Sequence, residues 1–171
     1  MILFDTDKHE HGLIDFYDNL FKDLKSKPIT LLELGVLRGG SLLYWNDYFD
    51  NAQIVGIDIN PIDLPNIPVY KAEQTNKERL DKIAKNHGLF DIIIDDCSHI
   101  YEKTQASFDI LYKYVKPGGM YIVEDWATGL NLGGQYLGLE KIVTNAIVNM
   151  SVKEVRAVKL EKGSVAVFYK K

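Results

Sequence analysis

The run F-D-I-I-I-D-D-C, residues 90–97, constrains the fold more than any other segment of the chain. Its three consecutive isoleucines leave no polar side for water, which is typical of a strand that is buried on both faces at the centre of a parallel sheet. Other short runs rich in Ile and Val alternate with longer amphipathic stretches. This alternation predicts an α/β fold in which helices cover both faces of the sheet.

Short apolar runs mark the remaining strands. Parallel strands are expected over residues 29–36, 53–59, 69–72, 90–97 and 120–126, with helices over 41–49, 76–86, 102–115 and 139–150. Residues 152–160 and 164–170 alternate apolar with polar side chains around a Glu-Lys-Gly turn, which predicts an antiparallel hairpin. The predicted sheet therefore has seven strands and is mostly parallel. Four glycines between residues 127 and 138 predict a mobile surface loop.

Composition narrows the class of protein. The length of 171 residues suits a single domain over residues 1–171, and the formal charge of -4 offers no basic surface for nucleic acid. Cys97 is the only cysteine, which excludes an intramolecular disulfide and fits a reducing compartment. The first residues are too acidic for a signal peptide, and no apolar run reaches membrane-spanning length. We therefore expect a cytoplasmic protein that binds neither nucleic acid nor membrane.

A glycine-rich turn follows the first predicted strand. In E-L-G-V-L-R-G-G-S, residues 33–41, the glycines allow the backbone to approach a ligand, and the next helix begins with free N–H groups. The spacing departs from G-x-G-x-x-G, and no Gly-Lys-Ser or Gly-Lys-Thr follows, which disfavours a dinucleotide fingerprint and a P-loop. The turn is interpreted either as a ligand cradle or as a purely structural element.

Asp58 ends the second predicted strand. A carboxylate at this place can accept hydrogen bonds from both hydroxyls of a ribose. The alternative is a solvated acid at a strand end. With the glycine turn upstream, we favour the ribose interpretation.

Four acids follow two strands that should be neighbours: Asp95 and Asp96 after one, Glu124 and Asp125 after the next. Carboxylates crowded at one rim are costly unless a positive charge neutralises them, and Mg²⁺ prefers oxygen ligands of this kind. Because successive side chains of a strand point to opposite faces, a metal set of Asp96, Glu124 and Asp125 requires the strand ends to bend.

His99 lies three residues beyond Asp96 on the same exit loop. A neutral imidazole beside a metal-bound hydroxyl can take its proton, so we predict that His99 is the general base. Two alternatives stay open: His99 caps the following helix, or it is itself a metal ligand.

These residues resemble the motifs of a known family. The glycine turn, Asp58, D-D-C-S-H at residues 95–99 and E-D-W at residues 124–126 are similar to those of class I S-adenosylmethionine-dependent methyltransferases. Within these, they resemble the metal-dependent sugar O-methyltransferases of macrolide biosynthesis, of the mycinamicin and demethylmacrocin type, and the cephalosporin hydroxylase and rhamnosyl O-methyltransferase group. T-D-K-H-E-H-G, residues 6–12, resembles a Thr-Asp-Lys segment that precedes the core of the macrolide-type enzymes.

The resemblance implies a Rossmann-like fold, with S-adenosylmethionine and Mg²⁺ as cofactors. Carried over by position, it assigns the cofactor to Thr6, Glu33, Gly35, Arg38, Gly39, Gly40, Ser41, Asp58, Gln74 and Asp95. Asp58 would hold the ribose and Gln74 would lie beside the adenine, while the helical segment 1–27, with Thr6, would close over the cofactor site. Asp96, Glu124 and Asp125 would bind Mg²⁺, and His99 matches the general base.

Two departures from the family pattern matter. Cys97 stands where the family usually has glycine, and the macrolide enzymes carry an additional N-terminal domain that these 171 residues do not contain. We therefore expect substrate contacts from the glycine-rich loop 127–138, with Trp126 and Tyr136 able to stack on a sugar ring.

The expected activity is methyl transfer to a hydroxyl of a sugar or sugar-containing small molecule. There are three alternatives: a catechol-type O-methyltransferase, a cofactor-binding subunit without chemistry, and an NAD-dependent oxidoreductase, which the absence of G-x-G-x-x-G disfavours. The apolar residues Phe16, Tyr17, Leu20 and Phe21 are expected either to pack against a second copy of the chain, giving a homo-oligomer, or to cover its own sheet.

Overall fold

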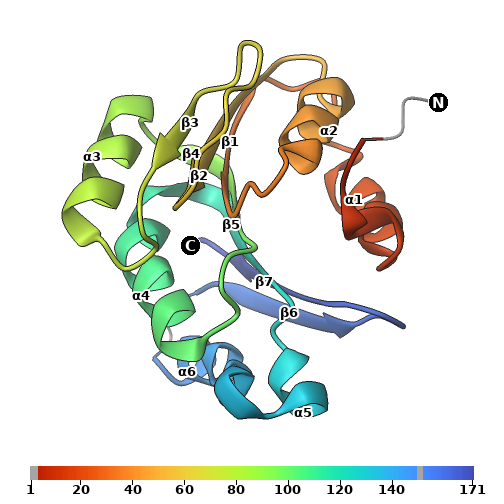
Figure 1. The fold of residues 1–171 in the computed structure, drawn as a ribbon, viewed down its shortest axis with the longest axis vertical. Helices are drawn as coiled ribbons and strands as arrows, with labels where there is room; N and C mark the ends of the chain where they lie inside the picture. The colour runs from red at the N-terminus through yellow and green to blue at the C-terminus, as the bar shows by residue number, and fades with distance from the viewer. Residues whose placement is uncertain (1–3, 150–151) are drawn as a thin grey trace.

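A sheet in the order β3-β2-β1-β4-β5-β7-β6 forms the centre of the computed structural model, which describes residues 4–149 and 152–171 (Figure 1). Its strands are β1 (Ile29–Leu34), β2 (Ala52–Asp58), β3 (Val69–Lys71), β4 (Phe90–Asp95), β5 (Val115–Glu124), β6 (Glu154–Lys159) and β7 (Ser164–Tyr169). The first five are parallel, and β7 joins β5 and β6 in antiparallel register. The prediction of a seven-stranded, mostly parallel sheet with a terminal hairpin is confirmed.

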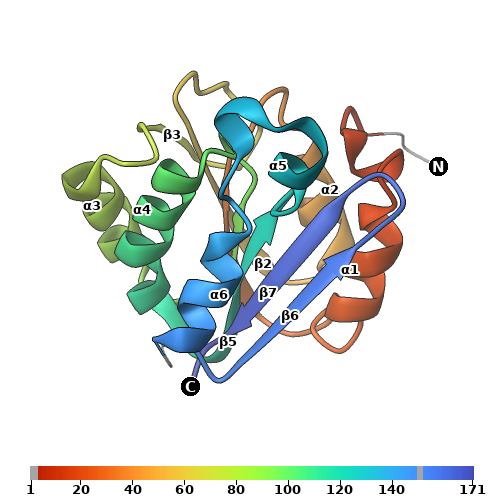
Figure 2. The ribbon, with the colours of Figure 1, turned by 90° about the horizontal axis from the view of Figure 1, so that it is seen from below.

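Helices cover both faces of this sheet (Figures 1 and 2). On one face, α1 (Leu13–Phe21) and α2 (Gly40–Tyr48) bury Leu13, Trp45 and their neighbours against β1, β4 and β5. On the other face lie α3 (Lys77–His87), α4 (Tyr101–Leu111) and α6 (Lys141–Val148). The isoleucines of β4 alternate between these layers, since Ile92 and Ile94 pack toward α2 and Ile93 toward α4. We call the layers the α2 face and the α4 face.

The N-terminal apolar residues cover the chain's own sheet. Tyr17 and Phe21 are fully buried. The ring of Tyr17 packs edge-on against Trp45 at 5.1 Å between centroids and stacks on Phe21 at 5.2 Å. A short 3-10 helix, η1 (Asp7–His9), precedes α1, and the two residues before it, Asp5 and Thr6, lie against Gly40 at the start of α2. Of the two alternatives for this segment, the structure shows intramolecular packing.

Two elements differ from the sequence prediction. β5 begins at Val115 rather than at residue 120, because Val115 already pairs with Phe90 before a register shift. The glycine-rich stretch expected to be a mobile loop forms α5 (Thr128–Leu132) and η3 (Gly134–Tyr136). A Cβ atom on Gly129 would lie 2.1 Å from the carbonyl oxygen of Tyr136, so this glycine serves close packing. A further 3-10 turn, η2 (Tyr112–Tyr114), ends α4.

The parallel strands bring their carboxyl ends to one edge of the sheet, and the strand order reverses between β1 and β4. Open α/β sheets bind ligands at this place. None of the helices in the described ranges is both long and apolar enough to cross a membrane.

Candidate active site

A cavity of about 670 Å³ opens at the carboxyl ends of β1, β2 and β4, where the strand order reverses. A cavity of this volume can hold a nucleoside. Segments that lie far apart in the sequence line it: residues 5–8, the turn after β1, the end of β2, residues 72–74 and residues 96–99. The place and the lining agree with the predicted cofactor site.

The glycine turn is tight because other backbone segments lie against it. A Cβ atom on Gly35, whose φ is +88°, would lie 2.0 Å from the carbonyl oxygen of Asp96. At Gly40 a Cβ atom would lie 2.0 Å from the carbonyl oxygen of Asp5. The turn therefore packs against the β4 exit loop at Gly35 and against the N-terminal segment at Gly40. The same two glycines line the cavity.

Asp58 lies at the cavity wall and ties the end of β2 to this turn. Its Oδ2 accepts hydrogen bonds from the backbone N–H groups of Val36, at 2.7 Å, and Leu37, at 3.2 Å. Its Oδ1 accepts one from the N–H of Asn60 at 2.7 Å. The carboxylate is half-buried and lines the cavity, so Asp58 is not simply a solvated acid at a strand end, and its contact with a ribose stays a prediction.

Most of the other predicted cofactor residues line the same cavity. Thr6, Arg38, Ser41 and Gln74 do so together with Gly35 and Gly40, whereas Gly39 is the N-cap residue of α2 and is not part of the lining. Gln74 is buried, and its amide is held by the hydroxyl of Ser98, which donates to Oε1. Arg38 is exposed and pairs with Asp5 at 3.3 Å.

Glu33 and Asp95 point into the protein, on opposite faces of the sheet. Glu33 is fully buried on the α2 face, where Ser41 donates to its Oε1 at 2.7 Å and Trp45 Nε1 donates to its Oε2 at 2.6 Å. Asp95 is buried on the α4 face and accepts hydrogen bonds from the hydroxyls of Ser107 and Tyr121. Burial raises the pKa of Asp95 to about 6. Neither acid lines the cavity. Each binds side chains of the helices and strands that surround it.

The strand ends bend as the metal prediction required. β5 ends at Glu124, and the next residue, Asp125, has φ +55°, a left-handed conformation that turns the chain. His99 has the same φ of +55° after β4. The turns bring ligand atoms of Asp96, His99 and Asp125 within 4.8 Å of one another, and all three side chains are half-buried.

This set fits a hard divalent cation, because two carboxylates and an imidazole can share one ion and carboxylate oxygens are the ligands that Mg²⁺ prefers. Nε2 of His99 lies 3.8 Å from Oδ1 of Asp96. His99 does not cap the following helix, since the N-cap residue of α4 is Ile100, without a side-chain cap. The roles of base and of ligand both agree with the position of His99.

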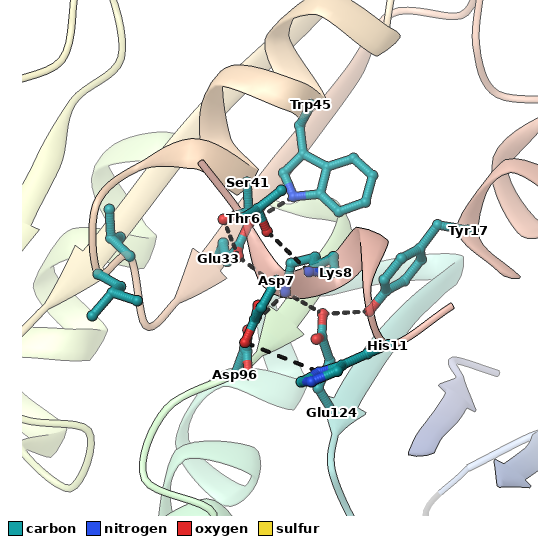
Figure 3. Close-up of polar contacts among 12 residues, drawn as sticks. Thr6, Asp7, Lys8, His11, Tyr17, Glu33, Ser41, Trp45, Asp96 and Glu124 are labelled. Atoms are coloured by element: carbon teal, nitrogen blue, oxygen red, sulfur yellow. Dashed lines mark hydrogen bonds and ion pairs between the residues drawn. The ribbon is translucent and has the colours of Figure 1, made fainter. Parts of the chain in front are cut away.

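Sequence reasoning missed Lys8, which lies at the centre of the acids (Figure 3). Only 1% of this lysine is exposed. Its Nζ lies 2.7 Å from Oδ2 of Asp96, 2.7 Å from Oε1 of Glu124 and 3.7 Å from Oε1 of Glu33. The crowding of the acids indicates that a positive charge lies nearby, and the T-D-K segment contains a lysine that could supply it. No spacing in the sequence connects that segment with the acids.

The electrostatics follow from burial and proximity. Burial alone would lower the pKa of Lys8, but its ion pairs with Asp96, Glu124 and Glu33 outweigh it and hold that pKa well above the ordinary value. Burial, followed by repulsion from Asp96, raises the pKa of Glu124. Oε1 of Glu124 is shared by Lys8 and the hydroxyl of Tyr17. Of the three predicted metal ligands, the structure brings Asp96 and Asp125 together with His99, but Glu124 is not part of that set.

Curated proteins with similar sequences are methyltransferases. The chain is 37% identical over 158 residues to the mycinamicin VI 2''-O-methyltransferase of Micromonospora griseorubida, covering 80% of this chain and 40% of that enzyme. It is 34% identical over 125 residues to the demethylmacrocin O-methyltransferase of Streptomyces fradiae, covering 67% of this chain and 32% of that enzyme. The chain thus spans well under half the length of these relatives. No family model matches it.

Solved structures of methyltransferases have a similar fold. MycE methyltransferase from the mycinamycin biosynthetic pathway, in complex with Mg, SAH and mycinamycin VI, superposes with a TM-score of 0.76 at 33% identity, over 92% of this chain and 49% of that one. Human methyltransferase-like protein 13 in complex with SAH, at 16% identity and a TM-score of 0.69, shares the fold alone. The chain has the fold of S-adenosylmethionine-dependent methyltransferases, and over most of its length its sequence is similar to part of the sugar O-methyltransferases of macrolide biosynthesis.

Proposed function

We propose that this chain transfers a methyl group from S-adenosylmethionine to a hydroxyl of a sugar or sugar-containing small molecule, with the help of Mg²⁺. One observation carries the proposal: the nucleoside-sized cavity and the cation set share Asp96 and His99, so donor and acceptor would meet on one loop. The sugar hydroxyl is inferred from the relatives, whose names specify O-methylation of mycinamicin VI and demethylmacrocin.

The residues have distinct roles in this proposal. Asp58 would accept hydrogen bonds from the ribose of the donor, and Gln74, fixed by Ser98, would lie beside its adenine. The turn around Gly35 and Gly40 would hold the methionine end, and residues 4–27 would close over the cavity. Ser41 and Arg38 would complete this wall, with Glu33 and Asp95 supporting it from the interior.

Asp96, Glu124 and Asp125 would hold the ion. When bound, Mg²⁺ lowers the pKa of a hydroxyl that binds it and fixes the orientation of that hydroxyl. His99 would accept the hydroxyl proton as the oxygen attacks the methyl carbon. The bond from methyl carbon to sulfur then breaks while the bond to oxygen forms, which leaves a methyl ether and a neutral thioether. The proton ends on the imidazole of His99.

Release of S-adenosylhomocysteine from S-adenosylmethionine tests the proposal. The acceptors compared are a methyl glycoside with vicinal hydroxyls, a catechol and no acceptor, each with Mg²⁺ and with EDTA. We expect turnover with the glycoside that EDTA abolishes and added Mg²⁺ restores. Turnover with the catechol alone would reassign the acceptor class, and turnover that survives EDTA would remove the metal from the mechanism.

A further inference from the structure

We propose that Lys8 is a positioning residue that couples the cofactor cavity to the cation site. Its backbone belongs to the segment that walls the cavity, while its ammonium holds the carboxylates at the ends of β4 and β5. Occupation of either site would then favour occupation of the other. This inference rests on the proposed function, because it requires a donor in the cavity and a cation at the rim.

Lys8 anchors residues 5–8 at the cavity wall through its buried ion pairs. Asp5, Thr6, Asp7 and Lys8 line the cavity, and the carbonyl of Asp5 lies against Gly40. The ion pair of Asp5 with Arg38 is exposed on both sides, and pairs of this kind contribute little. The buried ammonium of Lys8 is the strong polar anchor among these residues.

The buried carboxylates depend on the same ammonium. If the segment moved away, Glu124 and Glu33, which are buried in the docked structure, would lose the cation that pairs with them, and separating a buried ion pair is strongly unfavourable. The docked position of the segment and the observed arrangement of the acids therefore exist together.

Lys8 also sets the orientation of Asp96. It binds Oδ2 at 2.7 Å, which leaves Oδ1 on the side of His99, 3.8 Å from Nε2. The two oxygens are thus divided between the lysine and the proposed cation site. Hydrogen bonds of this kind orient metal-binding carboxylates and commonly change metal affinity by about 10- to 100-fold.

Coupling between two binding sites is reciprocal. If a donor analogue in the cavity stabilises the docked segment, it also stabilises the acid arrangement that receives the ion. S-adenosylhomocysteine should then tighten metal binding by the same factor by which metal tightens binding of S-adenosylhomocysteine. We expect a factor of about 5 or more for the natural chain.

Calorimetric titration of the full chain with Mn²⁺, with and without saturating S-adenosylhomocysteine, measures this factor. In Lys8→Met the factor should fall to about 1, at the lower limit of coupling. The factor is the readout rather than the metal affinity itself, because removing the ammonium disorders Asp96 but also removes a charge that repels the ion. Lys77→Met is the control, since Lys77 pairs with Asp81 on the exposed side of α3, and should keep the natural factor.

Hydrogen exchange of the natural chain gives a second test that needs no variant. Mn²⁺ alone, without the donor analogue, should slow exchange of the amides of residues 5–10, several of which are hydrogen-bonded within the segment. Exchange that stays unchanged when metal binds would overturn the proposal, even if Lys8→Met fails to fold.

Two other results would also overturn it: a natural coupling factor near 1 with both ligands bound, or an unchanged factor in Lys8→Met. A natural chain that binds neither S-adenosylhomocysteine nor Mn²⁺ is a different outcome, because it would contradict the proposed function itself.

Discussion

The hydroxyl of Tyr17 donates a 2.7 Å hydrogen bond to Oε1 of Glu124, the same oxygen that accepts one from Lys8. Tyr17 lies on α1, and Glu124 ends β5. The N-terminal helix is therefore joined to Glu124 by a buried polar contact, while the ring of Tyr17 packs on Trp45 of α2. This contact makes the helix part of the site's support.

Tyr17→Phe tests this support. The substitution keeps the ring but removes one donor from a buried carboxylate, so the free energy of unfolding should fall by about 1–2 kcal/mol. Denaturant titration measures the change. Tyr48→Phe is the control, because the hydroxyl of Tyr48 donates a long, 3.4 Å hydrogen bond to the carbonyl of Asp18 instead of contacting Glu124. Equal effects of the two substitutions would mean that the Tyr17 hydroxyl gives no special support.

Gly35→Ala tests the contact between the turn and the β4 exit loop. Gly35 and Gly88 have nearly the same φ, +88° and +85°, but of the two only Gly35 has atoms within 4 Å of the place that a Cβ would occupy, the nearest being the carbonyl of Asp96. Both alanine substitutions incur backbone strain of about 1–3 kcal/mol. Gly35→Ala should destabilise further and weaken binding of S-adenosylhomocysteine, as calorimetry would show, whereas Gly88→Ala should leave that binding unchanged.

Asp58→Asn tests the ribose contact. The amide keeps one acceptor oxygen but loses the negative charge, and hydrogen bonds to charged groups contribute about 1.5–3 kcal/mol. Affinity for S-adenosylhomocysteine should therefore fall by roughly 10- to 100-fold. Asp63→Asn, at an exposed position of the β2–β3 connection, is the matched control. Natural affinity in Asp58→Asn would leave Asp58 with a purely structural role.

His99→Ala tests the general base. Turnover should fall by about 100-fold or more, because positioned proton transfer contributes roughly 10²- to 10⁴-fold, while S-adenosylhomocysteine still binds. His87→Ala, at the end of α3, should keep its turnover, since His87 contacts Tyr70 and Gln53 instead. A rate near that of the natural chain for His99→Ala would assign the base elsewhere.

Asp81 gives a prediction about acid stability. Hydrogen bonds from Lys113 and Lys77 lower the pKa of Asp81 below its ordinary value. A lowered pKa in the folded state stabilises the fold above the unfolded-state pKa of about 3.9, and that contribution is lost as the pH falls. Asp81→Asn should therefore be less stable than the natural chain at pH ~7, and the difference should shrink in acid. Thermal melts across this pH range measure it.

The sheet could be predicted because its signals are local. The isoleucines of β4 and the glycine turn after β1 lie within a few residues of the features they predict. The bend at Asp125 is different, since its left-handed φ depends on β7, where the carbonyl of Ser164 accepts the Asp125 N–H at 2.7 Å. No pattern around Asp125 indicates that contact.

Only part of the site could be predicted from the sequence. The acids at the ends of β4 and β5 could be found because parallel strands end at one edge of a sheet. Lys8 was missed because 88 residues separate it from Asp96 and 116 separate it from Glu124. Its burial depends on how η1 docks against α2, which is a property of the tertiary structure. The roles of the cofactor and metal residues stay predictions.

Anomalous scattering from crystals grown with S-adenosylhomocysteine and Mn²⁺ would locate the ion and the donor product in one experiment. We predict one strong peak within bonding distance of Asp96 and Asp125, with the nucleoside in the adjoining cavity and its ribose against Asp58. A bound nucleoside with no peak at these acids, or a peak remote from the cavity, would contradict the shared site.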